Sequence, residues 1–178
     1  GGSFMPRMTA TEAHDITFTL NGKAVITRVS PRTLLTDVLR HAVGATGTHV
    51  GCEHGVCGAC TVQIDGEPAR ACLMLAGQAT GCVIRTVEAL ETASPVGARP
   101  ELSPLQAAFR DHFALQCGFC SSGILMSLDA LFARNPDASV ADIREALSGH
   151  LCRCTGYAPI ISAALAAQKR IKGGDKDA

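Results

Sequence analysis

Four cysteines in the first half of the chain have the spacing of ligands for an iron–sulfur cluster. Cys52, Cys57 and Cys60 follow a C-x4-C-x2-C pattern, and Cys72 comes after eleven further residues. This is the pattern of a plant-type 2Fe-2S cluster, in which four thiolates bind two irons. Glycines stand between these cysteines, and glycine lets a backbone curl closely around a cluster so that its N–H groups can point at the sulfurs.

Other uses of these cysteines fit the spacing less well. A structural zinc site usually takes C-x2-C pairs or mixed Cys and His ligands, and the one such pair here leaves Cys52 over. A Rieske centre needs two histidines, and the loop between Cys52 and Cys60 offers only His54. A disulfide framework is typical of short secreted chains. We expect no export signal here, because the first residues have no apolar core.

A second set of four cysteines lies in the last part of the chain. Cys117 and Cys120 form a C-x2-C pair, and Cys152 and Cys154 form a C-x-C pair. Each pair falls at a predicted helix junction, so the thiols converge if both junctions meet at one end of a bundle. A C-x-C pair suits a cluster better than a zinc site, which prefers two to four intervening residues. Helix N-termini after Cys120 and Cys154 would also favour an anionic cluster. The set predicts a second 2Fe-2S cluster, with structural zinc as the alternative.

Strands and one helix are expected to carry the first cysteine loop. Alternating apolar residues on both sides of the Asn21-Gly22 pair predict a β-hairpin. Apolar residues at helical spacing over 34–39 predict a helix that ends at Gly44. Alternating runs over 61–65 and 83–87 predict further strands. These elements together predict an α+β fold in which a mixed sheet packs against one helix.

Helices are expected to carry the second cysteine set. A Ser-Pro-x-Gln capping box opens residues 103–112, and apolar residues repeat at helical spacing over 123–132. Ser139 caps a third helix that ends at Gly149, and a fourth helix follows from about residue 159. Four short helices with tight connections predict a small bundle. Residues 89–103 have no clean period and indicate a linker.

The composition excludes several other classes of function. The 16 basic and 16 acidic residues balance, and there is no tryptophan and one tyrosine, so nothing favours nucleic acid. No apolar run is long enough to cross a bilayer. No nucleophile–base pair or carboxylate pair is evident, so we predict no catalytic residue. Nine cysteines without an export signal indicate the cytoplasm and metal ligation. Cys82, the ninth, is expected to pack as a small hydrophobe.

The two motif sets, in this order, resemble the small iron–sulfur subunit, or the fused N-terminal segment, of the xanthine dehydrogenase family of molybdenum hydroxylases. The matching segments are 51–62, 116–120 and 152–157. The resemblance implies a β-grasp ferredoxin-like domain over 13–90 and an all-α four-helix bundle domain over 100–172. Each domain would hold one 2Fe-2S cluster.

The resemblance also implies partners and a role. It implies a large subunit with a molybdopterin cofactor and usually a subunit with FAD, between which the chain relays electrons. In that family the helical cluster lies nearer the molybdenum, and residues matching Gln116 and Cys154 contact the pterin. The family often has proline two residues after the second helical-set cysteine, whereas this chain has Ser121-Ser122; we expect Ser121 to cap the helix instead. A free-standing two-cluster ferredoxin and a structural zinc-binding interaction module are the alternatives.

Overall fold

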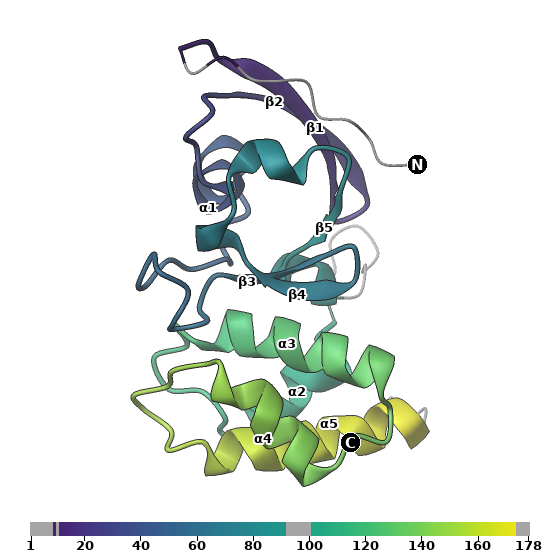
Figure 1. The fold of residues 1–178 in the computed structure, drawn as a ribbon. Coiled ribbons are helices and arrows are strands. Elements are labelled where there is room, and N and C mark those ends of the chain that lie inside the picture. The colour runs from purple at the N-terminus through teal and green to yellow at the C-terminus, as the bar shows by residue number, and fades with distance from the viewer. Residues whose placement is uncertain (1–8, 10, 92–100, 174–178) are drawn as a thin grey trace.

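A five-stranded mixed sheet forms the first half of the molecule (Figure 1). The computed structural model describes residues 9, 11–91 and 101–173. The strand order is β2-β1-β5-β3-β4; β1 pairs in parallel with β5, and the other pairs are antiparallel. The strands are β1 (His14–Leu20), β2 (Lys23–Val29), β3 (Thr61–Ile64), β4 (Glu67–Arg70) and β5 (Val83–Arg85).

Tight turns join the hairpins of the sheet. Asn21 and Gly22 have φ angles of 50° and 81°, as a two-residue hairpin turn requires, so the predicted hairpin is confirmed. Asp65 and Gly66 make the same kind of turn between β3 and β4, with φ of 51° and 87°. The sequence did not predict β4, which contains Pro68. The sheet tolerates this proline because β4 lies at its edge.

One helical segment covers the sheet and closes the first core. α1 (Leu35–Asp37) runs directly into a π-helical turn, η1 (Val38–Ala42), and Gly44 with φ of 75° follows the end of this segment as predicted. Buried residues from the segment and the sheet form one apolar cluster, which includes Ile16, Phe18, Leu20, Leu35, Val38, Leu39, Val62 and Ile84. Three 3-10 turns complete this half: η2 (Ala71–Leu73), η3 (Ala76–Ala79) and η4 (Val87–Leu90).

Four helices form the second half of the described chain and share a separate core. They are α2 (Pro104–Asp111), α3 (Ser121–Arg134), α4 (Val140–Ser148) and α5 (Ala158–Gly173). The capping box at Ser103 is confirmed, and so is Ser139 as the N-cap of α4. Ser121 does not cap α3, because it is already the first helical residue and Cys120 stands at the N-cap. An α+β half followed by a helical half is the order that the sequence predicts.

The two halves pack against each other along α3, which lies next to β3 and β4 in Figure 1. The buried Gln63 of β3 donates from Nε2 to the Met126 carbonyl (3.1 Å) and to the Asp129 carboxylate (2.7 Å) of α3. Arg85 adds an ion pair with Asp129 at 3.0 Å. A Cβ at Gly123 would overlap the Gly58 carbonyl oxygen, so the backbones approach closely here.

Candidate iron–sulfur centres

The first thiol set comes from two segments of the sheet half. Cys52, Cys57 and Cys60 come from the loop before β3, while η2 contributes Cys72. Cys60 and Cys72 are buried, and burial raises the pKa of the Cys60 thiol to about 11. The loop therefore turns inward toward the segment that carries the fourth cysteine, as a four-thiolate ligand set requires.

Backbone N–H groups of this loop already point at a sulfur. The Cys57 N–H lies 3.4 Å from Cys52 Sγ. This bond, helped by the backbone N–H groups of His54 and Val56, lowers the pKa of the Cys52 thiol to about 6. Hydrogen bonds to the thiolate favour its charged form, which is the form that binds iron. The loop thus supplies the polar environment expected around a cluster ligand.

Glycine is needed at two positions of this loop. Gly55 and Gly58 have φ angles of 82° and 80°, a region that side chains with a Cβ resist. A Cβ at Gly58 would also overlap the His150 ring and lie 2.6 Å from the Gly149 carbonyl oxygen. The curled loop and its close approach to the second half therefore both depend on Gly58.

The second thiol set comes from two loops between helices. One loop carries Cys117 and ends at Cys120, the N-cap of α3, and the other carries Cys152 and Cys154 between α4 and α5. The Sγ atoms of Cys154 and Cys117 lie 3.5 Å apart. Cys120 has Cys152 as its thiol hydrogen-bond partner, and burial raises the pKa of the Cys120 thiol to about 12.

The thiols of this set therefore pair across the two loops. A 2Fe-2S cluster takes two ligands on each iron, and one cysteine from each loop in each pair fits that demand. The positive end of the α3 dipole lies at Cys120, as expected. α5 begins at Ala158, close to the predicted start near residue 159, so its N-terminus follows Cys154 by four residues.

Gln116 connects the same two loops. Its exposed side chain donates from Nε2 to the Cys154 carbonyl oxygen at 3.0 Å. A glutamine amide has two N–H donors and one acceptor oxygen, so this bond leaves one donor and the acceptor for another group. The sequence singled out Gln116 for its place beside Cys117, and the structure gives it a role in joining the loops.

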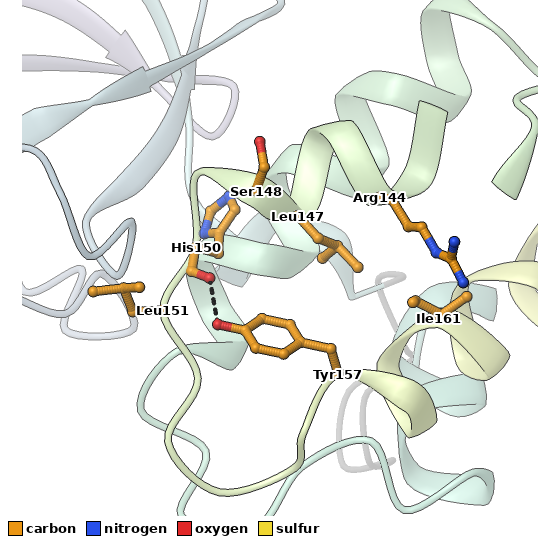
Figure 2. A pocket seen from close by; sticks show the side chains of 7 residues that line it. All are labelled: Arg144, Leu147, Ser148, His150, Leu151, Tyr157 and Ile161. Carbon is orange, nitrogen blue, oxygen red and sulfur yellow. Dashed lines mark hydrogen bonds between the residues drawn. The ribbon is translucent and has the colours of Figure 1, made fainter. Parts of the chain in front are cut away.

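Tyr157 fixes the backbone around Cys152. Its hydroxyl accepts the Cys152 N–H at 2.9 Å and donates to the His150 carbonyl at 3.0 Å, a bond drawn in Figure 2. The Tyr157 backbone has φ of 70°, which is unusual for a residue with a side chain. The ring also lines a surface pocket of about 260 Å³, together with Arg144, Leu147, Ser148, His150, Leu151 and Ile161 (Figure 2). This pocket adjoins the second thiol set but contains no cysteine.

Contacts between the halves bring the two cysteine loops side by side. The Leu151 N–H donates to the Cys57 carbonyl at 2.9 Å. The ring of His49 stacks on Phe119 with centroids 4.9 Å apart, and its Nδ1 lies 2.8 Å from the Phe119 carbonyl oxygen. Sequence reasoning missed His49 and Leu151, because no spacing relates them to residues so distant in the chain.

Cys82 stands apart from both thiol sets. It is partly buried and packs against the first core, as expected of a small hydrophobe. Burial, followed by the nearby Asp65 carboxylate, raises the pKa of its thiol. All nine cysteines lie in the part of the chain that the structure describes, and none forms a disulfide. No described helix is long and apolar enough to cross a membrane.

Comparisons with known proteins match both halves to iron–sulfur domains. Residues 18–86 match the family described as 2Fe-2S iron-sulfur cluster binding domain, and residues 86–165 match the family described as 2Fe-2S binding domain. Over 156 residues the chain is 56% identical to caffeine dehydrogenase subunit gamma of Pseudomonas sp. (strain CBB1), covering 85% of this chain and 89% of that one.

One further relative and one solved structure also match the chain over both halves. A probable xanthine dehydrogenase subunit of Bacillus subtilis (strain 168) is 42% identical over 159 residues, covering 89% of this chain and 88% of its own length. The crystal structure of quinoline 2-oxidoreductase from Pseudomonas putida 86 matches with a TM-score of 0.84 at 48% identity, over 92% of this chain and 99% of the matched chain. The similarity thus extends through both cysteine sets.

Proposed function

Since the chain belongs to the family of small iron–sulfur subunits of molybdenum hydroxylases related to xanthine dehydrogenase, we propose that it relays electrons from a molybdopterin centre in a partner subunit to a flavin or another acceptor. Each 2Fe-2S cluster, when bound, accepts and passes on one electron. The chain itself has no substrate site in this proposal. Its residues bind the clusters, hold the two cysteine loops together and contact the partners.

The observation that carries the proposal is the presence of two four-cysteine sets on adjacent loops. We assign Cys52, Cys57, Cys60 and Cys72 as ligands of one cluster, and Cys117, Cys120, Cys152 and Cys154 as ligands of the other. The first assignment is supported by the loop that turns inward toward Cys72. The second is supported by the pairing of thiols across two loops, with the sulfurs of Cys117 and Cys154 3.5 Å apart. The hydrogen bond from Leu151 to the Cys57 carbonyl supports electron passage between the halves, because it joins the backbones of the two ligand loops.

The partner that we propose for the helical half is a subunit that holds the molybdopterin cofactor. Gln116, Cys117 and Cys154 are exposed at one end of that half. Large apolar side chains are also exposed near the same loops: Phe113, Leu115, Phe119 and Leu151. Exposed apolar groups beside a redox site favour burial against another protein. In this arrangement Gln116 and Cys154 face the pterin, and a subunit with FAD lies nearer the first thiol set.

Three finer features remain part of the proposal. We propose that the sheet half is a β-grasp domain over 13–90, and that the four helices form a four-helix bundle domain over 100–172. The two separate apolar cores support this division. We also propose a cytoplasmic location, because nine unpaired cysteines suit a reducing compartment.

Metal analysis and spectroscopy of the full chain test the cluster assignment. We expect about four irons per chain and two distinct EPR signals after reduction, since each 2Fe-2S cluster holds two irons. A colourless protein with zinc, or one with two irons and one zinc, would refute the assignment of a cluster to both sets.

Purification from the native host tests the role as a subunit. We expect the chain to copurify with a molybdenum-containing protein, and the clusters of that complex to be reduced by its substrate. A free-standing two-cluster ferredoxin is the second candidate, since the cysteines of both sets lie on this one chain. The chain would then elute alone with both clusters intact, and that result would contradict the subunit assignment.

A further inference from the structure

We propose that the hydroxyl of Thr155 donates a hydrogen bond to the Cys152 sulfur and thereby raises the reduction potential of the helical cluster. The inference rests on the proposed function only in that Cys152 must be a cluster ligand. Thr155 is then a positioning and tuning residue of the electron relay, and it does not itself bind iron.

The geometry places Thr155 directly on this sulfur. Its Oγ1 lies 3.1 Å from Cys152 Sγ, within hydrogen-bonding range for oxygen and sulfur. Both residues are partly buried. Thr155 therefore stabilises negative charge on this sulfur.

The thiolate form of a cluster ligand, together with a second contact of Thr155, makes the hydroxyl the donor. The Tyr157 N–H donates to Thr155 Oγ1 at 3.2 Å. This bond occupies an acceptor position of the hydroxyl and turns its one proton away from Tyr157. A cysteine that binds iron is a thiolate and has no proton to give. In the proposed arrangement the proton of the Thr155 hydroxyl lies between the oxygen and Cys152 Sγ.

The rest of the loop supports this arrangement. Tyr157 holds the Cys152 peptide, because its hydroxyl accepts the Cys152 N–H. The same hydroxyl donates to the His150 carbonyl (Figure 2). The Cys152 N–H therefore donates to the Tyr157 hydroxyl and not to a sulfur. At Cys52 of the first set, backbone N–H groups point at the sulfur. At Cys152 the backbone N–H groups of Cys154 and Thr155 do the same, and the Thr155 hydroxyl adds a side-chain bond.

The effect on potential follows from charge. Adding an electron makes the ligand sulfurs more negative, so a hydrogen bond to Cys152 Sγ strengthens and favours the reduced state. Hydrogen bonds to the sulfurs are among the factors that set the potential of such clusters. The proton stays on Thr155 throughout, and no bond to it breaks. Removal of the hydroxyl should therefore make the helical cluster harder to reduce.

The test uses the full chain with both clusters assembled, compared with T155V, T155S and T80V. Valine keeps the shape of threonine and removes the hydroxyl, while serine keeps the hydroxyl. Thr80 is a matched control, because its hydroxyl bonds to the Gly77 carbonyl and lies outside both thiol sets. The measurements are the midpoint potentials of both EPR signals and the exchangeable protons coupled to each reduced cluster, detected by ENDOR after transfer to deuterated water.

We expect T155V to make reduction of the helical cluster about tenfold less favourable, which is about 59 mV for a one-electron couple. T155V should also lose one exchangeable proton coupling, while T155S and T80V keep wild-type values. Equal potentials in T155V and wild type would overturn the proposal, and so would equal shifts in T155V and T155S. If T155V assembles no helical cluster, T155A replaces it in the same comparison.

The wild-type protein separates this inference from the proposed function. Absence of a helical cluster in wild type would refute the assignment of Cys152 as a ligand. A normal helical cluster whose potential and proton couplings do not respond to loss of the hydroxyl would refute the role of Thr155 alone. A structural role, limited to the bond from the Tyr157 N–H, would lower the melting temperature without removing a proton coupling.

Discussion

The sulfurs of Cys117 and Cys154 lie 3.5 Å apart although 37 residues separate them in the chain. α3 and α4 lie between them in the sequence, and the packing of these two helices brings Cys154 back beside Cys117. Gln116 closes the same junction through its bond to the Cys154 carbonyl. The geometry of the helical site is therefore set by helix packing, whereas three of the four cysteines of the first set share one loop. Changes at the two sites should have different consequences.

Cys57→Ser should remove the cluster of the first set and leave the helical cluster in place. Serine cannot supply a thiolate, and the helical thiols sit on their own core. The backbone bond between Cys57 and Leu151 remains in the variant. EPR of the reduced full chain should lose one signal only. Cys82→Ser is the matched control and should keep both signals. Loss of both signals in Cys57→Ser would show that the sites do not assemble independently.

Gln63→Ala should loosen the junction between the sheet and α3. The buried Gln63 bonds to Met126 and Asp129, and its Oε1 accepts from Arg85. Its loss leaves polar groups without partners, so we expect the free energy of unfolding to fall by about 2–3 kcal/mol. Denaturant unfolding measures this change. Gln78→Ala, at an exposed glutamine whose side chain bonds only to the Leu75 N–H among the described residues, should cost well under half as much; equal losses would contradict the prediction.

The sequence could predict those elements that local chemistry determines. The turn at Asn21-Gly22 and the N-caps at Ser103 and Ser139 each depend on residues within a few positions of one another. β4 was missed because Glu67–Arg70 has no alternating apolar pattern and contains a proline, and only pairing with β3 makes it a strand. Ser121 was misplaced by one position, since Cys120 already serves as N-cap.

The candidate site also has features that the sequence predicts and features that it does not. The spacing of the cysteines reveals both sets, because cluster ligands must recur at short intervals in a loop. The contacts that hold the cysteine loops together do not follow any spacing. The stack of His49 on Phe119 links residues 70 positions apart, and the bond of Gln116 spans 38 positions. Such contacts follow from how the helices and the two halves pack, and they are visible only in three dimensions.

Gln116→Ala distinguishes a contact with the pterin from a bond that only joins the loops. The bond to the Cys154 carbonyl is exposed, so its loss should cost no more than about 1 kcal/mol of stability. If Gln116 also contacts the cofactor of the partner, reduction of the helical cluster by substrate should slow in the assembled complex. Stopped-flow reduction, with a melting curve of the subunit, measures both effects. A lowered melting temperature with wild-type reduction kinetics would rule out the cofactor contact.

Gly58→Ala should be far more harmful than Gly81→Ala, although both glycines have nearly the same backbone. Their φ angles are 80° and 79°, so alanine meets similar strain at each position, about 1–2 kcal/mol. The surroundings differ. A Cβ at Gly81 has open space, whereas a Cβ at Gly58 would overlap the His150 ring and crowd the Gly149 carbonyl.

The additional steric overlap of an alanine at position 58 disturbs the contact between the two cysteine loops. Gly58 lies between Cys57 and Cys60, and His150 precedes Cys152 by two residues. Relief of the overlap must move one loop away from the other, so we expect Gly58→Ala to lose the first cluster and to change the EPR spectrum of the helical one. Gly81→Ala should keep both signals and lower only the melting temperature. Intact signals and similar melting temperatures in the two variants would show that the close approach at Gly58 is not required.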